Sequence, residues 1–311
     1  MQWHKGMIGH LFLAPGFAMP SRSSLTPVLL AIGALAIAMA SYQCGAAVAK
    51  HLFSQVGAQG ATAFRLGLGA LMMLAVRRPW RTARRSANWR ALWGYGLSMG
   101  AMNMVFYMAL RTIPLGIAVA LEFTGPLAIA LFASRQLLDF AWIALAVIGL
   151  FLLLPLHGHA HALDPIGVLY ALAAGVGWAL YILFGQKAGL AFGADAVTLG
   201  IAIGALLAVP VGFAHVGTAL FSMALLPLGL GVAVLSSVLP YSLEMIALTR
   251  LDARTFSVLL SLEPAIAALA GMVFLGERLG TLQWLAIASI VAASAGAAFG
   301  ARQPVAEPLA N

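Results

Sequence analysis

The chain has 311 residues, of which 62% are apolar and only 8% are charged, and its formal net charge is +8. Soluble globular proteins average roughly 25% charged residues, so this composition excludes a soluble protein and predicts an all-α polytopic membrane protein. The basic residues cluster in a few loops, which favours a role in membrane orientation over nucleic-acid binding. The single cysteine, Cys44, excludes an intramolecular disulfide.

The first 24 residues are interpreted as an N-terminal tail. Lys5 precedes a short apolar run that resembles a signal peptide, but Pro15 and Gly16 interrupt the run and no clear cleavage site follows. Two interpretations stay open: the segment is an unremoved tail, or the native start is Met19.

Ten apolar stretches follow, each about as long as an α-helix that crosses a hydrocarbon core of ~30 Å. Their approximate ranges are 27–49, 58–76, 91–110, 115–134, 140–156, 165–185, 197–213, 226–248, 255–275 and 282–299. A tight turn at 111–114 joins the third stretch to the fourth, and 301–311 form a C-terminal tail. An even number of spans puts both termini on the same side of the membrane.

The lysines and arginines predict which side that is. With the N-terminus in the cytoplasm, thirteen of them fall inside and only three, Lys50, Arg111 and Arg278, fall outside. Six arginines at 77–90 are interleaved with tryptophans, a pattern also seen in nucleic-acid binding. The positive-inside and aromatic-belt rules favour a cytoplasmic loop at headgroup level instead, so both termini are expected in the cytoplasm.

The fourth stretch, 115–134, carries a carboxylate, Glu122, in an almost wholly apolar sequence. Pro126 has no N–H to donate, and its ring clashes with the carbonyl four residues earlier, which belongs to Glu122. The Gly125-Pro126 break would therefore place an ionisable side chain and an unpaired backbone oxygen at one depth. Such groups face protein or a water-filled cavity rather than lipid, so this stretch predicts the floor of a transport site.

The linker at 157–164 contains alternating histidines, His157, His159 and His161, followed by Asp164. Histidines and an acid can bind zinc or copper. No second cluster of ligands completes a closed site, so a polar loop is the default interpretation and no metal is expected.

A shift of the sequence by 138 residues aligns Pro126 with Pro264, and Leu97-Ser98 with Leu235-Ser236. We interpret this match as two five-helix repeats, at 25–156 and 165–300. Because five is odd, the second repeat runs through the membrane upside down. Inverted repeats are a recurrent design of secondary transporters, with substrate held at the midplane between them.

The acids do not follow this symmetry. In the same register Glu122 aligns with Leu260, and Glu263 aligns with Gly125. The prolines correspond and the glutamates do not, so the two glutamates are expected to act from inequivalent positions.

Four ionisable residues lie within predicted spans: Arg65, Glu122, Glu244 and Glu263. A charge at the bilayer centre costs at least ~2.5–3.5 kcal/mol, so each needs a partner or a cavity. The alternatives are a structural pair or a neutral carboxyl on one hand, and a substrate or proton site on the other. Arg65 either binds a substrate carboxylate with its two-pronged guanidinium or locks helices together.

Further polar and aromatic candidates for the site lie on other spans, although such groups often only join helices. They are Tyr95, Asn103, Trp178, Tyr181 and Tyr241, beside Ser41, Tyr42 and Gln43. A zwitterion pocket needs these types: carboxylates for an ammonium, an arginine or amides for a carboxylate, and aromatic rings to shape it. The helix-break residues are Gly125, Pro126 and Pro264.

Several motifs are missing from the sequence. It contains no G-x-x-x-x-G-K-[ST] phosphate loop, no H-E-x-x-H, no C-x-x-C and no G-x-S-x-G nucleophile elbow. An ATP-driven pump is therefore excluded for this chain, and coupling to an ion gradient remains. A buried carboxyl is the usual proton carrier in such systems.

The strings at 114–126 (PLGIAVALEFTGP), 239–251 (LPYSLEMIALTRL) and 263–265 (EPA) resemble the EamA-type drug/metabolite transporter family. The similarity runs from about residue 25 to residue 299. It implies ten helices in two EamA-type repeats, and efflux of small metabolites against protons. Members of the family export amino acids, nucleobases, sugars and drugs, and this sequence is most similar to members that export threonine and homoserine.

We therefore expect a secondary-active exporter of small neutral amino acids, threonine and homoserine first, in the bacterial inner membrane. Its partners are the substrate, protons and the lipid bilayer, with no cofactor and no nucleic acid. The alternatives are an EamA-type exporter of another metabolite or drug and, more remotely, a membrane-embedded enzyme that uses the intramembrane carboxylates on lipid. The sequence leaves the oligomeric state open, a homodimer included.

Overall fold

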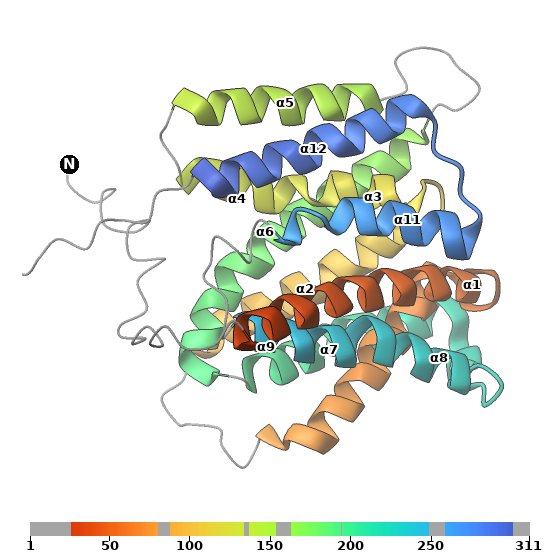
Figure 1. The fold of residues 1–311 in the computed structure, drawn as a ribbon. Coiled ribbons are helices and arrows are strands. Elements are labelled where there is room, and N and C mark those ends of the chain that lie inside the picture. The colour runs from red at the N-terminus through yellow and green to blue at the C-terminus, as the bar shows by residue number, and fades with distance from the viewer. Residues whose placement is uncertain are drawn as a thin grey trace, which may run out of the picture.

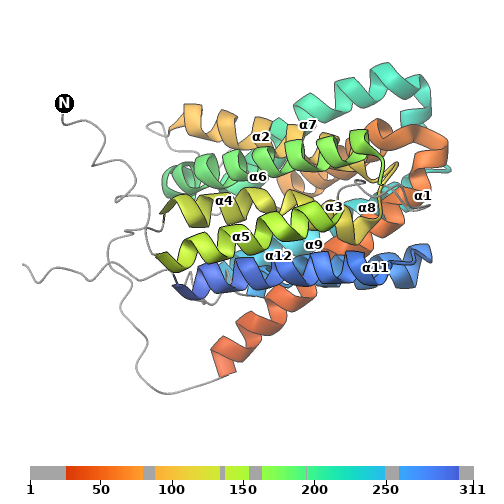
Figure 2. The same ribbon diagram turned by 90° about the horizontal axis from the view of Figure 1, so that it is seen from above.

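The computed structural model describes residues 26–79, 88–133, 137–153, 163–193, 195–248 and 259–300. Every secondary-structure element in these ranges is a helix, which confirms the all-α prediction. The helices pack side by side into one bundle, seen from two directions in Figure 1 and Figure 2. The N-terminal tail with its alternative start at Met19, the histidines at 157–161, the middle of the arginine-rich loop, residues 249–258 and the C-terminal tail lie outside the described residues.

The first part of the chain contributes five elements. They are α1 (Thr26–Arg77), α2 (Trp89–Ala109), α3 (Leu115–Glu122), α4 (Thr124–Ala133) and α5 (Leu137–Leu153). The second part contributes α6 (Pro165–Phe192), α7 (Asp195–Val216), the 3-10 helix η3 (Gly217–Phe221), α8 (Leu226–Ala233), the π-helix η4 (Val234–Val238), α9 (Leu239–Leu248), α11 (Glu263–Leu275) and α12 (Thr281–Gly300).

By length and composition, four of the described stretches are long and apolar enough to cross a membrane. They are Leu29–Arg77, Pro165–Phe192, Asp195–Phe221 and Leu226–Glu244. Shorter apolar helices cover Leu115–Ile129, Phe140–Gly149, Glu263–Leu275 and Thr281–Ala293. Large apolar side chains such as Val76, Leu190 and Val273 are exposed on the outside of the bundle. So much exposed apolar surface is typical of a protein that contacts lipid.

Helix α1 contains the first two predicted spans in one element, because no loop separates them. The backbone stays helical past Lys50 and kinks at Gly57, whose φ is 61° and ψ is 179°. A positive φ favours glycine, since it carries no Cβ. The helix therefore continues about two turns beyond residue 49, the predicted end of the first span.

The predicted break in the fourth span is present, but it lies one turn before Pro126. Helix α3 ends at Glu122, and α4 begins at Thr124. At the junction the hydroxyl of Thr124 donates to the carbonyl oxygen of Leu121 at 2.6 Å. Pro126 then lies in the first turn of α4, where its missing N–H leaves no bond unmade. Pro264 occupies the same kind of position, directly after the first residue of α11.

The junction between α3 and α4 presses against α6 at Gly175. A Cβ built on Gly175 would lie 2.7 Å from the backbone oxygen of Glu122. A Cβ built on Gly125 would overlap the backbone oxygen of Gly175. The broken helix can approach α6 this closely only because both contacting positions are glycine.

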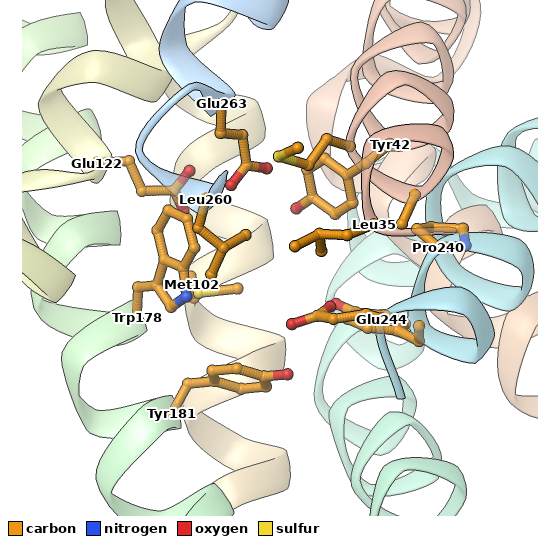
Figure 3. Close-up of a pocket in the computed structure, with 13 residues that line it drawn as sticks. Leu35, Tyr42, Met102, Glu122, Trp178, Tyr181, Pro240, Glu244, Leu260 and Glu263 are labelled. Atoms are coloured by element: carbon orange, nitrogen blue, oxygen red, sulfur yellow. The ribbon is translucent and has the colours of Figure 1, made fainter. Parts of the chain in front are cut away.

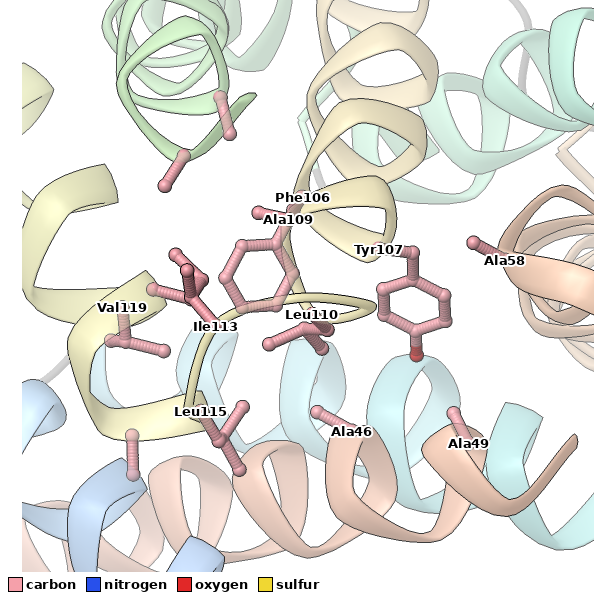
Figure 4. Packing of buried hydrophobic residues seen from close by; sticks show 14 of the residues in the cluster. Ala46, Ala49, Ala58, Phe106, Tyr107, Ala109, Leu110, Ile113, Leu115 and Val119 are labelled. Atoms are coloured by element: carbon pink, nitrogen blue, oxygen red, sulfur yellow. The ribbon is translucent and has the colours of Figure 1, made fainter. Parts of the chain in front are cut away.

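The turn between α2 and α3 closes one end of the bundle. Figure 4 shows Phe106, Leu110, Ile113 and Leu115 packed around this turn, beside Ala46 of α1. All five side chains are essentially removed from solvent. This apolar plug separates the middle of the bundle from the end at which α3 begins.

Helix α6 begins at the same end and is capped by Asp164. The carboxylate accepts hydrogen bonds from the backbone N–H groups of Ile166 (3.2 Å) and Gly167 (3.1 Å). A hydrogen bond from the Thr112 hydroxyl, together with these two, holds the pKa of Asp164 below its usual range. The turn before α3 and the start of α6 are thereby joined.

We expect Gly175→Ala to lower the thermal unfolding midpoint of the detergent-solubilised protein. The added methyl group meets backbone of the α3–α4 junction, which cannot move aside as a flexible side chain can, and such overpacking costs about 1–3 kcal/mol. Gly189→Ala is the matched control, because it lies on the same helix and a Cβ there meets nothing within 4 Å. Equal midpoints for the two variants would contradict the close contact.

Candidate functional site

A cavity lies in the middle of the bundle, between helices from both parts of the chain. It is lined by Leu35, Ala38, Met39 and Tyr42 of α1, Met102 of α2, Glu122 of α3, Trp178 and Tyr181 of α6, Pro240, Tyr241 and Glu244 of α9, and Leu260 and Glu263 next to and on α11. Its volume is about 60 Å³, whereas roughly 10–15 Å³ suffices for one water molecule. The cavity therefore has room for several waters or a small solute.

Three carboxyl groups enter this cavity from three different helices. Glu122 and Glu263 are 4% and 7% exposed, and Glu244 is half-buried. Figure 3 shows the carboxyl groups of Glu122 and Glu263 pointing toward each other, with Glu244 on the opposite side of the cavity. Carboxylates that face one another in a low-dielectric site repel, so the arrangement favours a bound proton or cation.

A glutamine holds one of these carboxyls in place. The side-chain amide of Gln43 donates a hydrogen bond to Oε1 of Glu263 at 3.1 Å. Gln43 is fully buried, and its own Oε1 has no partner among the described residues. The contact joins α1 to α11 across the two parts of the chain.

Aromatic rings form the wall of the cavity on α6. Trp178 packs edge-on against Phe123, with ring centroids 5.4 Å apart. Tyr181 stacks on Tyr95 at 4.8 Å, and their hydroxyl groups are 3.3 Å apart. Paired rings of this kind are held in one orientation, so the wall keeps its shape and presents polar edges.

Six of the predicted site residues line this cavity: Glu122, Glu244, Glu263, Trp178, Tyr181 and Tyr241. The other three lie behind its wall. Tyr95 touches Tyr181, and the amide of Asn103 donates to the backbone oxygen of Met99 at 2.7 Å. Of the predicted helix-break residues, Pro264 directly follows Glu263, while Gly125 and Pro126 lie in the first turn of α4, the helix after Glu122.

Arg65 lies outside the cavity lining and is completely buried. Its Nε donates to the hydroxyl of Ser237 at 3.3 Å, and its Nη2 donates to the backbone oxygen of Ser236 at 2.9 Å. The guanidinium also lies over the rings of Tyr42 and Tyr107, at 4.6 and 5.5 Å from their centroids. Arg65 therefore attaches the second half of α1 to the π-helix η4.

Sequence reasoning missed the apolar lining residues Leu35, Met39, Met102 and Leu260. Apolar residues are too common in this sequence to single them out by type. The involvement of Tyr42 was signalled only weakly, by its place in a polar triplet within an apolar span.

An ion pair that was not predicted from the sequence lies at the plugged end of the bundle. Nζ of Lys50 lies 2.7 Å from Oε1 of Glu277. Oε2 of the same carboxylate accepts the backbone N–H of Leu115 at 2.9 Å, at the start of α3. Glu277 lies just after α11, so one carboxylate connects α1 and α3 to the second part of the chain.

The order of features is the same along three helices. In α1 the cavity residue Tyr42 comes before Ala46 of the apolar plug and Lys50 of the ion pair. In α11 Glu263 comes before Ala268, and Glu277 follows just after the helix. Helix α3 runs the opposite way, from Leu115 at the ion pair to Glu122 at the cavity. The plug and the ion pair therefore close the cavity at this end of the bundle.

Within the described residues, no group of three or more histidine, cysteine, aspartate or glutamate side chains is arranged to hold a metal ion. The arrangement offers carboxyl groups to a proton or to an organic cation instead.

Comparison with known proteins is informative at this point. Residues 165–299 match the model of the EamA-like transporter family. The chain is 53% identical over 285 residues to the threonine/homoserine exporter RhtA of Salmonella typhimurium (strain SL1344), covering 92% of this chain and 97% of the relative. For the threonine/homoserine exporter RhtA of Escherichia coli (strain K12) the identity is 52%, with the same coverage. A solved crystal structure with 19% sequence identity superposes with a TM-score of 0.56, covering 88% of this chain and 97% of that chain, which bears on the fold alone.

We expect Glu277→Ala to lower the thermal unfolding midpoint, because it removes the acceptor of two hydrogen bonds, one of them from a charged group. A hydrogen bond to a charged group contributes about 1.5–3 kcal/mol. Glu277→Gln keeps an acceptor for Leu115 and should fall between Glu277→Ala and the wild type. The double reversal Lys50→Glu with Glu277→Lys should recover part of the loss seen in each single reversal. If the loss of stability in the double reversal equals the two single losses added together, the ion pair contributes nothing to stability.

Proposed function

The chain belongs to the EamA-like transporter family, and on this premise we propose that it is a secondary-active exporter of threonine and homoserine in the bacterial inner membrane. The observation that carries the proposal is the mid-bundle cavity with carboxyl groups from α3, α9 and α11. The two curated relatives described above carry the name threonine/homoserine exporter and match nearly the whole chain.

The cavity suits the ammonium group and the side-chain hydroxyl of an amino acid. An ammonium group between Glu122 and Glu263 reduces the repulsion between two carboxylates that face each other. The side chains of Tyr241 and Glu244 line the same cavity and can accept or donate a hydrogen bond to a substrate hydroxyl. Threonine and homoserine both carry that hydroxyl, which distinguishes them from aliphatic amino acids.

The same carboxyl groups support proton antiport. A proton and the substrate ammonium compete for this pair of facing carboxyls, because a carboxyl that holds a proton no longer offers its negative charge to the ammonium. Competition between proton and substrate for one site is the minimal requirement for exchange across the membrane. Binding a proton from outside would release the amino acid there, and losing that proton inside would make room for the next one.

We further propose ten membrane-crossing segments in two inverted repeats, 25–156 and 165–300. Three pairs of helices support this topology: the second half of α1 with α7, α3 with α11, and α5 with α12. In each pair the contacts run in opposite directions along the two helices, as equivalent helices in inverted repeats must. The close approaches are Gly60 to Val216 and Gly67 to Val209; Leu115 to Gly271 and Gly116 to Ala268; Gly149 to Ile290 and Trp142 to Gly296.

The cavity lining also supports the repeat. Under the 138-residue shift Met102 corresponds to Pro240, and Glu122 corresponds to Leu260. All four residues line the cavity. A site on the axis between two related halves is where alternating access by a rocking motion leaves the substrate nearly in place.

For the orientation we propose cytoplasmic termini, as the distribution of lysine and arginine requires. The end carrying Lys50, Glu277 and the apolar plug then faces outward. In this arrangement the described structure is closed toward the outside, and export requires the plug and the ion pair to separate.

The purified protein in proteoliposomes should transport labelled threonine, and unlabelled homoserine should compete for it. Overexpression in cells should lower intracellular threonine and confer resistance to excess homoserine. Transport of neither amino acid, together with altered resistance to a different metabolite or drug, would assign the protein to another substrate within the family.

Glu122→Gln should fold normally yet reduce threonine transport at least tenfold, because the amide cannot hold a proton or balance an ammonium. The measurement is initial transport rate in proteoliposomes with equal amounts of protein. Asp164→Asn is a suitable control, since this carboxylate lies outside the cavity and asparagine also caps helices well. Full transport by Glu122→Gln would remove this glutamate from the mechanism.

A pH gradient should drive threonine transport if protons are the counter-ion. Acidification of the compartment that receives threonine should accelerate wild-type transport severalfold over equal pH, and a protonophore should abolish the difference. Threonine exchange that proceeds at the same rate with and without the gradient would exclude proton antiport while leaving the export function intact.

A further inference from the structure

The cavity provides for only one of the two charges of an amino acid. Among the described residues, its lining contains three glutamates and no lysine, arginine or histidine. An ammonium group finds partners there, whereas a carboxylate at the same place meets only like charge. If threonine and homoserine are the substrates, as proposed above, their carboxylate needs a cation from elsewhere.

Arg65 is the one cation buried next to this cavity among the described residues. It is 0% exposed, and no carboxylate in the described part of the chain lies within 4.0 Å of its guanidinium. It donates hydrogen bonds to the hydroxyl of Ser237 and the carbonyl of Ser236, and its Nη1 has no hydrogen-bond partner in the part of the chain that the structure describes. A buried charge with no carboxylate in direct contact is costly, and a carboxylate bound at Nη1 would reduce that cost.

One aromatic ring contacts this guanidinium and also lines the cavity. Arg65 is 4.6 Å from the ring centroid of Tyr42, and Tyr42 lines the cavity. Figure 3 shows the Tyr42 side chain reaching into the cavity near Glu263. A ring stacked on the face of a guanidinium leaves the N–H groups at its edge free to bond in the guanidinium plane.

The backbone near Arg65 is irregular as well. Ser236 and Ser237 belong to the π-helix η4, an element that is rare and often found at functional sites. Arg65 comes from the first part of the chain and η4 comes from the second. An anion on this guanidinium would therefore act on the contact between the two parts.

We propose that Arg65 is the carboxylate-binding group of the substrate site and that Tyr42 covers it until substrate enters. A change of the Tyr42 rotamer brings the carboxylate to Nη1 and Nη2 of Arg65 while the ammonium stays between Glu122 and Glu263. The site then recognises both charges of an α-amino acid, and it selects against amines that lack a carboxylate. This inference rests on amino-acid export as the function.

Threoninamide tests this assignment, because it keeps the ammonium and the hydroxyl of threonine but has no negative charge. Binding is measured by competition against labelled threonine and, independently of transport, by the fluorescence of the reconstituted protein, whose Trp178 lines the cavity. We expect the wild type to prefer threonine over threoninamide at least tenfold. A site built around a buried charged donor penalises a ligand that leaves it unpaired.

In Arg65→Gln the affinity for threonine should fall to that for threoninamide, and the affinity for threoninamide should stay within about twofold of the wild type. Arg65→Lys keeps the charge but loses the two-pronged geometry, so it should retain only part of the preference.

Ser237→Ala provides the test if the Arg65 variants do not fold. It removes one acceptor that orients the guanidinium and leaves its charge in place. It should weaken threonine binding severalfold and leave threoninamide unchanged, and an equal effect on both ligands would overturn the proposal. The proposal would also be overturned if folded Arg65→Gln kept the preference for threonine that the wild type shows. Equal binding of threonine and threoninamide by the wild type would overturn it as well. A wild type that binds and transports neither threonine nor homoserine would instead refute the proposed function.

Discussion

Hydrocarbon offers no hydrogen-bond partners, so a protein in a membrane must satisfy its buried polar groups with its own atoms or around a cavity. Three glutamates and one arginine carry this constraint here. Glu263 is held by Gln43, and the carboxyls of Glu122 and Glu244 reach the same cavity. Arg65 uses two serines and two aromatic rings. The helices around the cavity are packed so that the glutamates reach it and Arg65 bonds to η4.

Closure at one end follows from packing rather than from charge. Small residues let the broken helix α3–α4 approach α6 and α11, and the turn between α2 and α3 fills the remaining space with large apolar side chains. The pair of Lys50 and Glu277 lies beyond this plug and holds the start of α3. For export toward this end, the apolar plug and the ion pair beyond it must both separate.

Helices of one half of the chain pack in opposite directions against helices of the other half, but the acidic residues of the two halves are placed differently. Prolines at 126 and 264 both lie in the first turn of a helix. The glutamate comes before the break in one half and after it in the other, so the carboxyls of Glu122 and Glu263 approach each other from different directions. An exact repeat of one acidic position would not produce this facing pair.

The sequence alone determined the all-α membrane class and the family, because apolar composition and the strings around Glu122, Glu244 and Glu263 are local features. It also identified the carboxylates, since an acid in an apolar span is conspicuous. It placed the helix break within one turn, because proline acts on the residues directly before it. Only the tertiary structure decided that Arg65 lies behind Tyr42, that Asn103 lies outside the cavity, and that Lys50 pairs with Glu277. Those relations join residues far apart in the chain, and they depend on how helices face one another, which apolar residues on every side of a helix do not specify.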